Sequence, residues 1–380
     1  MKKTFKYKLK LSPIQLKELN DIFWFCRFLY NNALEERILV FKTTKESRTY
    51  KEQSKFLPEI KKIFACETSK IHSQTLQFTL KQVDSAYKNF FERNKSDKVG
   101  FPRFKGKDRF RSICFPQVFD DLSKMRGIQK LPNDNLKVSG LTGEVKVIWH
   151  RPIEGRCKQA RIVRKVDQYY LCLSCDNVPN NILSKTGKEV AIDFGITNFI
   201  TMDDGSKIHH PKPYNTAKEK LAYRQRILSA KQKESNNYNK QRKLVRKTYE
   251  KITNIRDDFS HKTANYLIKN YDRIIIEYLN IKNMLEKGDN YSVKKRNISD
   301  VAIGKFVEFL TYKAESADKL IVKVNPKNTS KMCSCCGKLN KNLTLADRVY
   351  KCEFCKLAID RDHNSAINIK RLGTSLAITK

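Results

Sequence analysis

Three acidic residues that lie far apart in the chain each occupy a local sequence suited to holding a metal ion. Asp193 lies in a strongly apolar segment, Glu277 ends the apolar run 274–276, and Asp362 lies near the start of the predicted helix 364–369. A charge in an apolar strand must be paired or bind a metal. Carboxylate oxygens are ligands that Mg²⁺ prefers, and two such ions about 4 Å apart can drive phosphodiester hydrolysis. The sequence therefore predicts a magnesium site formed by these three residues.

The third ligand of this site has two possible identities. Asp360 and Asp362 flank one arginine in the segment Asp360-Arg361-Asp362, close to the predicted helix. We favour Asp362 as the ligand, and expect Asp360 either to support the site from behind or to cap the helix.

Four cysteines form two closely spaced pairs, which is typical of a structural zinc site. Cys333 and Cys336 are separated from Cys352 and Cys355 by fifteen residues. Each pair can place two thiolates on one tetrahedral ion. Four thiolates leave no position for water, so the predicted zinc is structural. Cys335 lies inside the first pair and is expected to point away from the ion.

The charge of the chain indicates the class of its partner. Among 380 residues, 77 are Lys or Arg and 40 are Asp or Glu, a formal net charge of +37. Such an excess repels itself unless a polyanion neutralises it, and contacts with phosphates are favoured by counterion release. No run of about 18 apolar residues could span a bilayer, and no apolar segment of a secretory signal follows the start. Nucleic acid is the predicted partner, a membrane is not, and a cytoplasmic location is expected.

Two segments concentrate this basic charge. The loop 100–107 interleaves basic and aromatic residues, which suits either a connector with buried rings or a nucleic-acid contact. The helical segment 218–256 holds thirteen basic residues against three glutamates, and we favour a phosphate-facing role over a merely solvated face. The candidate nucleic-acid-binding residues are Arg103, Lys105, Lys107, Arg224, Lys240, Arg242, Lys243, Arg246 and Lys247.

In the first half of the chain, helices interrupt a β region. Alternation of aromatic or aliphatic residues with lysine predicts a strand over 5–11, after which Ser12-Pro13 starts a helix. Helical periodicity continues to about residue 93, and its aromatics, including Trp24 and Phe91, are interpreted as helix-bundle core. The region 108–178 reads as strands, with a hairpin turn at Asp167-Gln168. We expect the first strand to join this β region.

The second half of the chain alternates strands and helices around the acidic residues. The expected elements are a polar linker (179–187), one strand (189–201), a tight turn (203–205), a long helical stretch (about 215–271), a strand ending at Glu277, a polar loop (282–298), a helix (about 299–318) and a short strand (321–324).

The acidic and cysteine motifs together resemble those of the TnpB family, the transposon-associated RNA-guided nucleases related to type V CRISPR effectors. The most specific segments are Asp193-Phe194-Gly195, 276–281, 329–337 and 360–369, and the segment 254–262 fits the family's long helix. The resemblance covers essentially the whole chain. It implies that the three carboxylates named above are the family's catalytic residues, and all three are intact here.

The resemblance also implies a fold and a division into domains. The fold is α+β and multidomain: a split β-barrel (wedge) with a helical insertion, then an RNase H-like (RuvC) α/β domain with an inserted zinc ribbon. The expected divisions are a first wedge-barrel segment (1–11), a helical recognition domain (12–99), a second wedge-barrel segment (100–180), a first segment of the RuvC-like nuclease (188–325), a zinc ribbon that binds target nucleic acid (326–357), a second segment of the RuvC-like nuclease (358–372) and a short tail (373–380).

The implied function is RNA-guided cleavage of DNA beside a short target-adjacent motif, by two-metal hydrolysis in the RuvC-like site. The expected cofactors are two Mg²⁺ and one structural Zn²⁺. The expected partners are a guide RNA derived from the transposon end and double-stranded target DNA, with the chain a monomer on its RNA. Two alternatives stay open: an RNA-guided DNA-binding regulator that does not cut, and an unguided RuvC-like nuclease or transposase accessory. The intact carboxylates argue against the first alternative.

Overall fold

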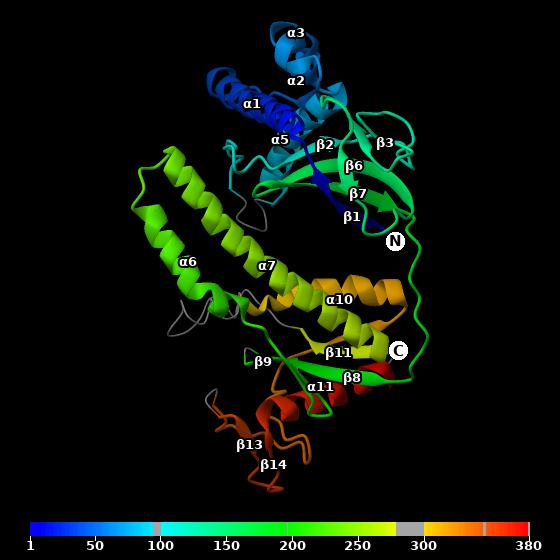
Figure 1. Ribbon diagram of the computed structural model, residues 1–380. Coiled ribbons are helices and arrows are strands. Elements are labelled where there is room, and N and C mark those ends of the chain that lie inside the picture. Colours follow the sequence, from blue (N-terminus) through cyan, green and yellow to red (C-terminus); the bar gives the residue numbers. More distant parts are fainter. Residues whose placement is uncertain (94–99, 196, 279–299, 345–346, 379–380) are drawn as a thin grey trace. The chain divides into compact units, whose positions relative to one another are not determined.

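The computed structural model describes residues 1–93, 100–195, 197–278, 300–344 and 347–378 (Figure 1). The chain divides into two compact units, Met1–Pro179 and Asn180–Lys380. Each unit combines helices with a five-stranded sheet, so the fold is α+β. The predicted polar loop 282–298 lies outside the described residues. No described helix combines the length and the apolar character that a membrane span requires.

The sheet of the first unit joins the start of the chain to segments more than a hundred residues later. Its strands are β1 (Lys3–Lys10), β2 (Ser112–Phe115), β5 (Lys146–Ile148), β6 (Arg156–Lys165) and β7 (Gln168–Asp176), antiparallel in the order β2-β6-β7-β1-β5. β1 lies between β7 and β5, so the prediction that the first strand joins this β region is confirmed. The β6–β7 turn is Val166-Asp167, one residue earlier than predicted. The hairpin of β3 (Ile128–Lys130) and β4 (Leu136–Val138) forms a separate sheet.

The segment between β1 and β2 contains the described helices α1 (Pro13–Thr44), α2 (Tyr50–Lys55), α3 (Leu57–Ile63), α4 (Ala65–Thr68) and α5 (Ser73–Arg93). The Ser12 hydroxyl accepts the Gln15 N–H, and the Gln15 side chain accepts the Ser12 N–H, so the predicted start of α1 is confirmed. The prediction that Trp24 and Phe91 lie in the core is wrong, because they are 46% and 63% exposed. Trp24 lies about 100° around α1 from its buried neighbour Phe23.

The sheet of the second unit contains β8 (Glu189–Phe194), β9 (Asn198–Met202), β10 (Lys207–His209), β11 (Arg273–Glu277) and β12 (Leu320–Val324). The order is β10-β9-β8-β11-β12, and β8, β11 and β12 are parallel. The prediction of one strand over 189–201 is wrong, because the chain reverses after β8 and pairs back as β9. Gly195 permits this reversal, since a Cβ there would lie 2.6 Å from the carbonyl oxygen of Asn198.

Helices cover both faces of this second sheet (Figure 1). α7 (Asn236–Asn270) and α10 (Ile303–Ala317) pack on one face, and α11 (Arg361–Ile378) packs on the other. The predicted long helix 215–271 is two helices, because α6 (Pro213–Ser229) ends before Ser235 caps α7. The helix α11 continues to Ile378, into the segment expected to be a short tail (373–380). Near the cysteines, β13 (Val349–Lys351) pairs with β14 (Ala358–Asp360).

Candidate functional site

Asp193 and Glu277 lie side by side on one face of the second sheet. β8 and β11 are parallel neighbours whose register pairs Ile192 with Ile276, so the next positions along are Asp193 and Glu277. Side chains alternate between the faces of a strand. The residues two positions before each acid pack in the cluster that includes α11. Both carboxylates are therefore directed to the α11 face.

Asp362, in the first turn of α11, brings a third carboxylate to this face. The pKa of Asp193 lies well above its ordinary value, because burial and then the charges of Glu277 and Asp362 disfavour its ionised form. Because the charges of Glu277 and Asp362 act on Asp193, the three carboxylates lie near one another on the α11 face.

Glu277 is tied to the segment that carries the cysteines. It is 8% exposed, and the Thr329 hydroxyl donates a hydrogen bond to its Oε1. Burial raises the pKa of Glu277, and the bond from Thr329 partly offsets this rise. A carboxylate held in this way has a fixed orientation, which a metal ligand requires.

Asp360 has protein partners for both of its oxygens. Its Oδ1 accepts the backbone N–H groups of Asp362 at 3.0 Å and His363 at 3.1 Å, so it caps α11. Its Oδ2 lies 2.8 Å from the Lys207 ammonium. Asp362 is thus the aspartate of this pair whose charge reaches Asp193.

Asp203, which follows β9, fixes β8 relative to α11. Its Oδ1 accepts the N–H of Ala191 at 2.8 Å, and its Oδ2 pairs with the Lys370 ammonium. Its carbonyl oxygen lies 3.1 Å from Nε2 of His363. The sequence reasoning missed this role, because the Asp-Asp-Gly signal indicated only a turn.

The four paired cysteines form the metal-ligand cluster of the described residues, with their Sγ atoms within 4.8 Å of one another: Cys333, Cys336, Cys352 and Cys355. Each pair lies on a similar turn, in which Gly337 or Lys356 follows the second cysteine with φ of 73° or 63°. Backbone N–H groups, first that of Cys355, lower the pKa of the Cys352 thiol to about 6, which favours a thiolate at Cys352. The pKa values of Cys336 and Cys355 are raised, and neighbouring thiols are among the causes. Cys335 is exposed and outside this cluster.

Two fully buried asparagines of α11 hold the first cysteine turn. Asn364 accepts the Ser334 N–H at 2.9 Å and donates to the Met332 carbonyl at 2.8 Å. Asn368 donates to the carbonyls of Thr329 and Met332. The helix that carries the third carboxylate therefore also positions the cysteine cluster. Sequence reasoning missed both residues, although two polar side chains four apart in an apolar helix are a readable signal.

Lys105 and Arg224, which are among the nine candidate nucleic-acid-binding residues, contact other parts of the chain. The Lys105 ammonium lies 3.9 Å from the centroid of the Tyr30 ring, and burial lowers the pKa of Lys105. Arg224 donates from α6 to the Leu244 carbonyl and the Thr248 hydroxyl of α7, and so joins the two helices. The others are exposed or half-buried on the loop and on the first half of α7: Arg103, Lys107, Lys240, Arg242, Lys243, Arg246 and Lys247.

Three family models match this chain. A model described as a probable transposase, OrfB of IS605, matches residues 173–288, and a Cas12f1-like TNB domain matches residues 304–369. A model described as a helix-turn-helix domain matches residues 1–46. In this structure that last range is β1 followed by the single long helix α1.

Similar proteins extend over nearly the whole chain. A "Putative RNA-guided DNA endonuclease" of Streptomyces pristinaespiralis is 29% identical over 98% of this chain and 90% of its own length. The "Putative RNA-guided DNA endonuclease InsQ" of Escherichia coli K12 is 28% identical over 97% of this chain and 92% of its own length. The CRISPR-associated endodeoxyribonuclease Cas12f1 of Sulfoacidibacillus thermotolerans is 23% identical over 60% of this chain and 56% of its own length. A solved complex of Cas12f1 with sgRNA and target DNA aligns at 20% identity and a TM-score of 0.36, over 97% of this chain and 98% of that chain.

Proposed function

We propose that this chain, which belongs to the TnpB family, is an RNA-guided DNA endonuclease of a mobile element. The observation that carries the proposal is the shared face of Asp193, Glu277 and Asp362, on which burial and then the two neighbouring carboxylates raise the pKa of Asp193. Like charges gathered at a half-buried position favour a bound cation, because only a cation offsets their repulsion.

The three carboxylates would hold Mg²⁺, and the donor set fits, since hard carboxylate oxygens are its preferred ligands. Bound Mg²⁺ would supply an activated water and would stabilise the leaving oxygen of the phosphodiester. The chain's own residues set the geometry: Thr329 orients Glu277, Asp360 fixes the first turn of α11, and Asp203 joins that helix to β8.

The four-cysteine cluster would hold one structural Zn²⁺. Thiolate donors suit zinc, and four of them close its tetrahedral coordination. Because Asn364 and Asn368 bind the turn that begins this cluster, zinc would also steady the α11 helix beside the carboxylates.

The partners are a guide RNA and double-stranded target DNA. A net charge of +37 suits two nucleic acids, and pairing of guide with target supplies sequence specificity. In this proposal the first unit forms the split wedge and the helical recognition module, and reads the short target-adjacent motif. The second unit holds the RuvC-like nuclease with its zinc ribbon, within the boundaries expected from the sequence.

The first test is to purify the chain from cells that carry its element and to sequence the co-purifying RNA. One RNA of defined sequence is expected. The complex should cut a plasmid that contains the matching target in Mg²⁺, and should not cut it in EDTA. An unguided nuclease would cut without a defined RNA.

A second test separates cutting from binding. Asp193→Ala should retain RNA and DNA binding while cleavage is lost. The matched control is Asp258→Ala, which removes an exposed carboxylate of α7 that pairs with Lys262 one turn along the same helix, and it should cut normally. Undiminished cleavage by Asp193→Ala would show that the carboxylate assignment is wrong.

A further inference from the structure

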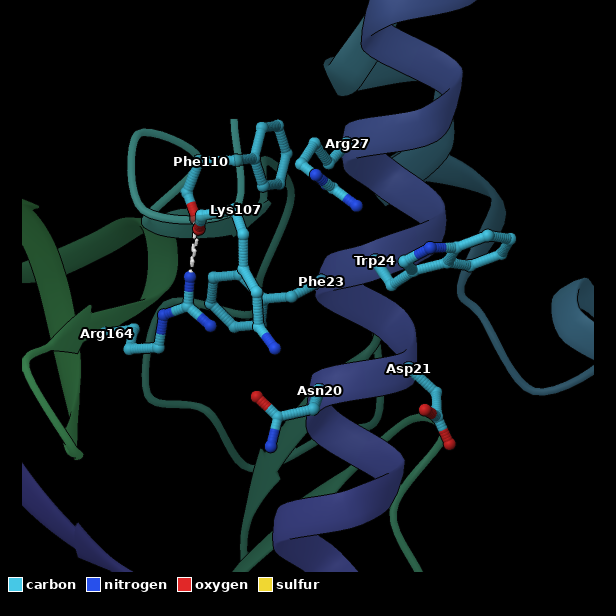
Figure 2. A pocket seen from close by; sticks show the side chains of 8 residues that line it. All are labelled: Asn20, Asp21, Phe23, Trp24, Arg27, Lys107, Phe110 and Arg164. Carbon is cyan, nitrogen blue, oxygen red and sulfur yellow. Dashed lines mark hydrogen bonds between the residues drawn. The ribbon is translucent and has the colours of Figure 1, made fainter. Parts of the chain in front are cut away.

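A small cavity opens beside α1 in the first unit, whereas the carboxylates and the cysteines belong to the second (Figure 2). Its volume is about 290 Å³. Asn20, Phe23 and Arg27 extend from α1 toward Phe110 and Arg164, while Trp24 leaves the other edge of the helix. The volume is at the small end of ligand pockets, so the cavity suits one small group such as a phosphate.

The charge around the cavity favours an anion. Arg27, Lys107 and Arg164 are three cations, against the one carboxylate of Asp21. Within the described residues, Arg27 and Lys107 have no ion-pair partner, and Lys107 is exposed. Arg164 is held in place, because its guanidinium donates to the Lys107 and Phe110 carbonyls. Cationic side chains around a concave surface bind phosphate oxygens, and the counterions released from the nucleic acid favour this binding.

The aromatic side chains beside these cations offer a stacking surface. Trp24 is 46% exposed, and one face of its indole stacks on Phe28 with ring centroids 5.5 Å apart and an angle of 11°. The rings of Phe23 and Phe110 line the cavity 6.3 Å apart, edge to face. Trp24 and Arg27 are three residues apart, so they occupy neighbouring positions on the helix surface. A stacking ring beside a cation is the pattern that recognises unpaired bases.

We propose that one unpaired nucleotide binds across this edge of α1, with its base stacked on Trp24 outside the cavity and its phosphate held at the cavity by Arg27 and Lys107. The proposal rests on the proposed function, which brings RNA and a displaced DNA strand to this chain. A base in a duplex is excluded, because it is stacked on both faces and cannot reach the indole. The same chemistry could come from the guide RNA or from the displaced DNA, and the test distinguishes them.

The test uses the full chain, freed of RNA by high salt, with Trp149→Phe so that Trp24 is the only indole. The probes are an oligouridine, an oligothymidine and a DNA duplex, each of about 12 units. Quenching of Trp24 fluorescence by a single strand is expected, and the strand that binds more tightly identifies the source. A 5-iodouracil in that strand should crosslink to the tryptic peptide 18–27.

Variants separate stacking from charge. Trp24→Leu should weaken single-strand binding roughly tenfold. Arg27→Gln and Lys107→Gln should each lower the slope of log affinity against log salt by about one. The matched controls are Phe41→Leu and Lys42→Gln, an exposed aromatic and an exposed cation of the same helix outside the cavity, and both should bind as the parent. All variants should melt as the parent does, since none removes a buried side chain.

Two results would overturn the proposal: single-strand affinity of Trp24→Leu within about twofold of the parent, or equal quenching by the duplex. A complex that cuts its target normally while Trp24 stays unquenched would refute the cavity assignment alone. A chain that carries no defined RNA and does not cut would instead refute the proposed function.

Discussion

The crowding of carboxylates on the α11 face predicts that Asp193→Asn stabilises the protein when Mg²⁺ is absent. The folded protein raises the pKa of Asp193, because burial and the charges of Glu277 and Asp362 penalise its ionised form. A raised pKa contributes no penalty while the group is protonated at low pH. The penalty accumulates as the pH rises above the ordinary value of 3.8, and it is complete once the pH exceeds the pKa of Asp193 in the folded protein.

The size of the effect follows from linkage. Each unit by which folding raises the pKa of Asp193 costs about 1.4 kcal/mol once the pH exceeds that raised value. For a folded unit of about 200 residues, about 1 kcal/mol shifts the melting temperature by roughly 2–4 °C. Each pKa unit should therefore raise the melting temperature of the Asn variant by about 3–6 °C in EDTA. Bound Mg²⁺ at a hundred times its Kd should stabilise the parent by about 2.7 kcal/mol, and this gain should shrink in the variant.

The assay is calorimetry of parent and variant at pH 7, once in EDTA and once in Mg²⁺, and again at pH 4. The order of stability should invert on adding Mg²⁺, and the difference in EDTA should diminish at pH 4. Asp272→Asn is the matched control, for which the expected change in stability has the opposite sign. Bonds from Lys319 and then the N–H of Thr186 lower the pKa of Asp272, so its loss should destabilise the chain at pH 7. A lower melting temperature of Asp193→Asn in EDTA would refute the reasoning, because it would mean that the charge is stabilised by the protein alone.

Three further outcomes are expected. Cys352→Ser should reduce the zinc content from about one ion per chain, measured by elemental analysis, while Cys335→Ser should leave it unchanged. Asp362→Asn should slow cleavage roughly a hundredfold or more, corresponding to about 3 kcal/mol of lost charge stabilisation, with RNA binding intact in a filter assay. Arg224→Leu should cost about 1.5–3 kcal/mol of local stability, since it loses charge-assisted bonds to Thr248 and a carbonyl of α7, and limited proteolysis should then cut near residues 230–235. Normal zinc in Cys352→Ser, full cleavage by Asp362→Asn or unchanged proteolysis of Arg224→Leu would each contradict its assignment.

Features that depend on short spacing could be predicted from the chain alone. The two cysteine turns, the capped start of α1 at Ser12, and the strand that ends at Glu277 each follow from residues a few positions apart. Local backbone geometry decides such features, so neighbouring residue types are sufficient to predict them. The role of the acid at the end of an apolar strand could also be predicted, because a buried charge needs a partner or a metal ion.

The partners of individual side chains, by contrast, depend on how distant segments pack. Trp24 has the sequence context of a core residue, yet it is exposed, because the buried face of α1 is set by elements far along the chain. Lys105 was a candidate for binding nucleic acid, in a loop that also suited a connector, and its ammonium lies against the Tyr30 ring. Asp360 and Asp362 lie in similar sequence surroundings, but their roles differ in the fold. The carboxylate of Asp360 binds Lys207 and the first turn of α11. Spacing along the chain fixes local conformation, whereas the environment of a side chain depends on contacts that form only in the folded protein.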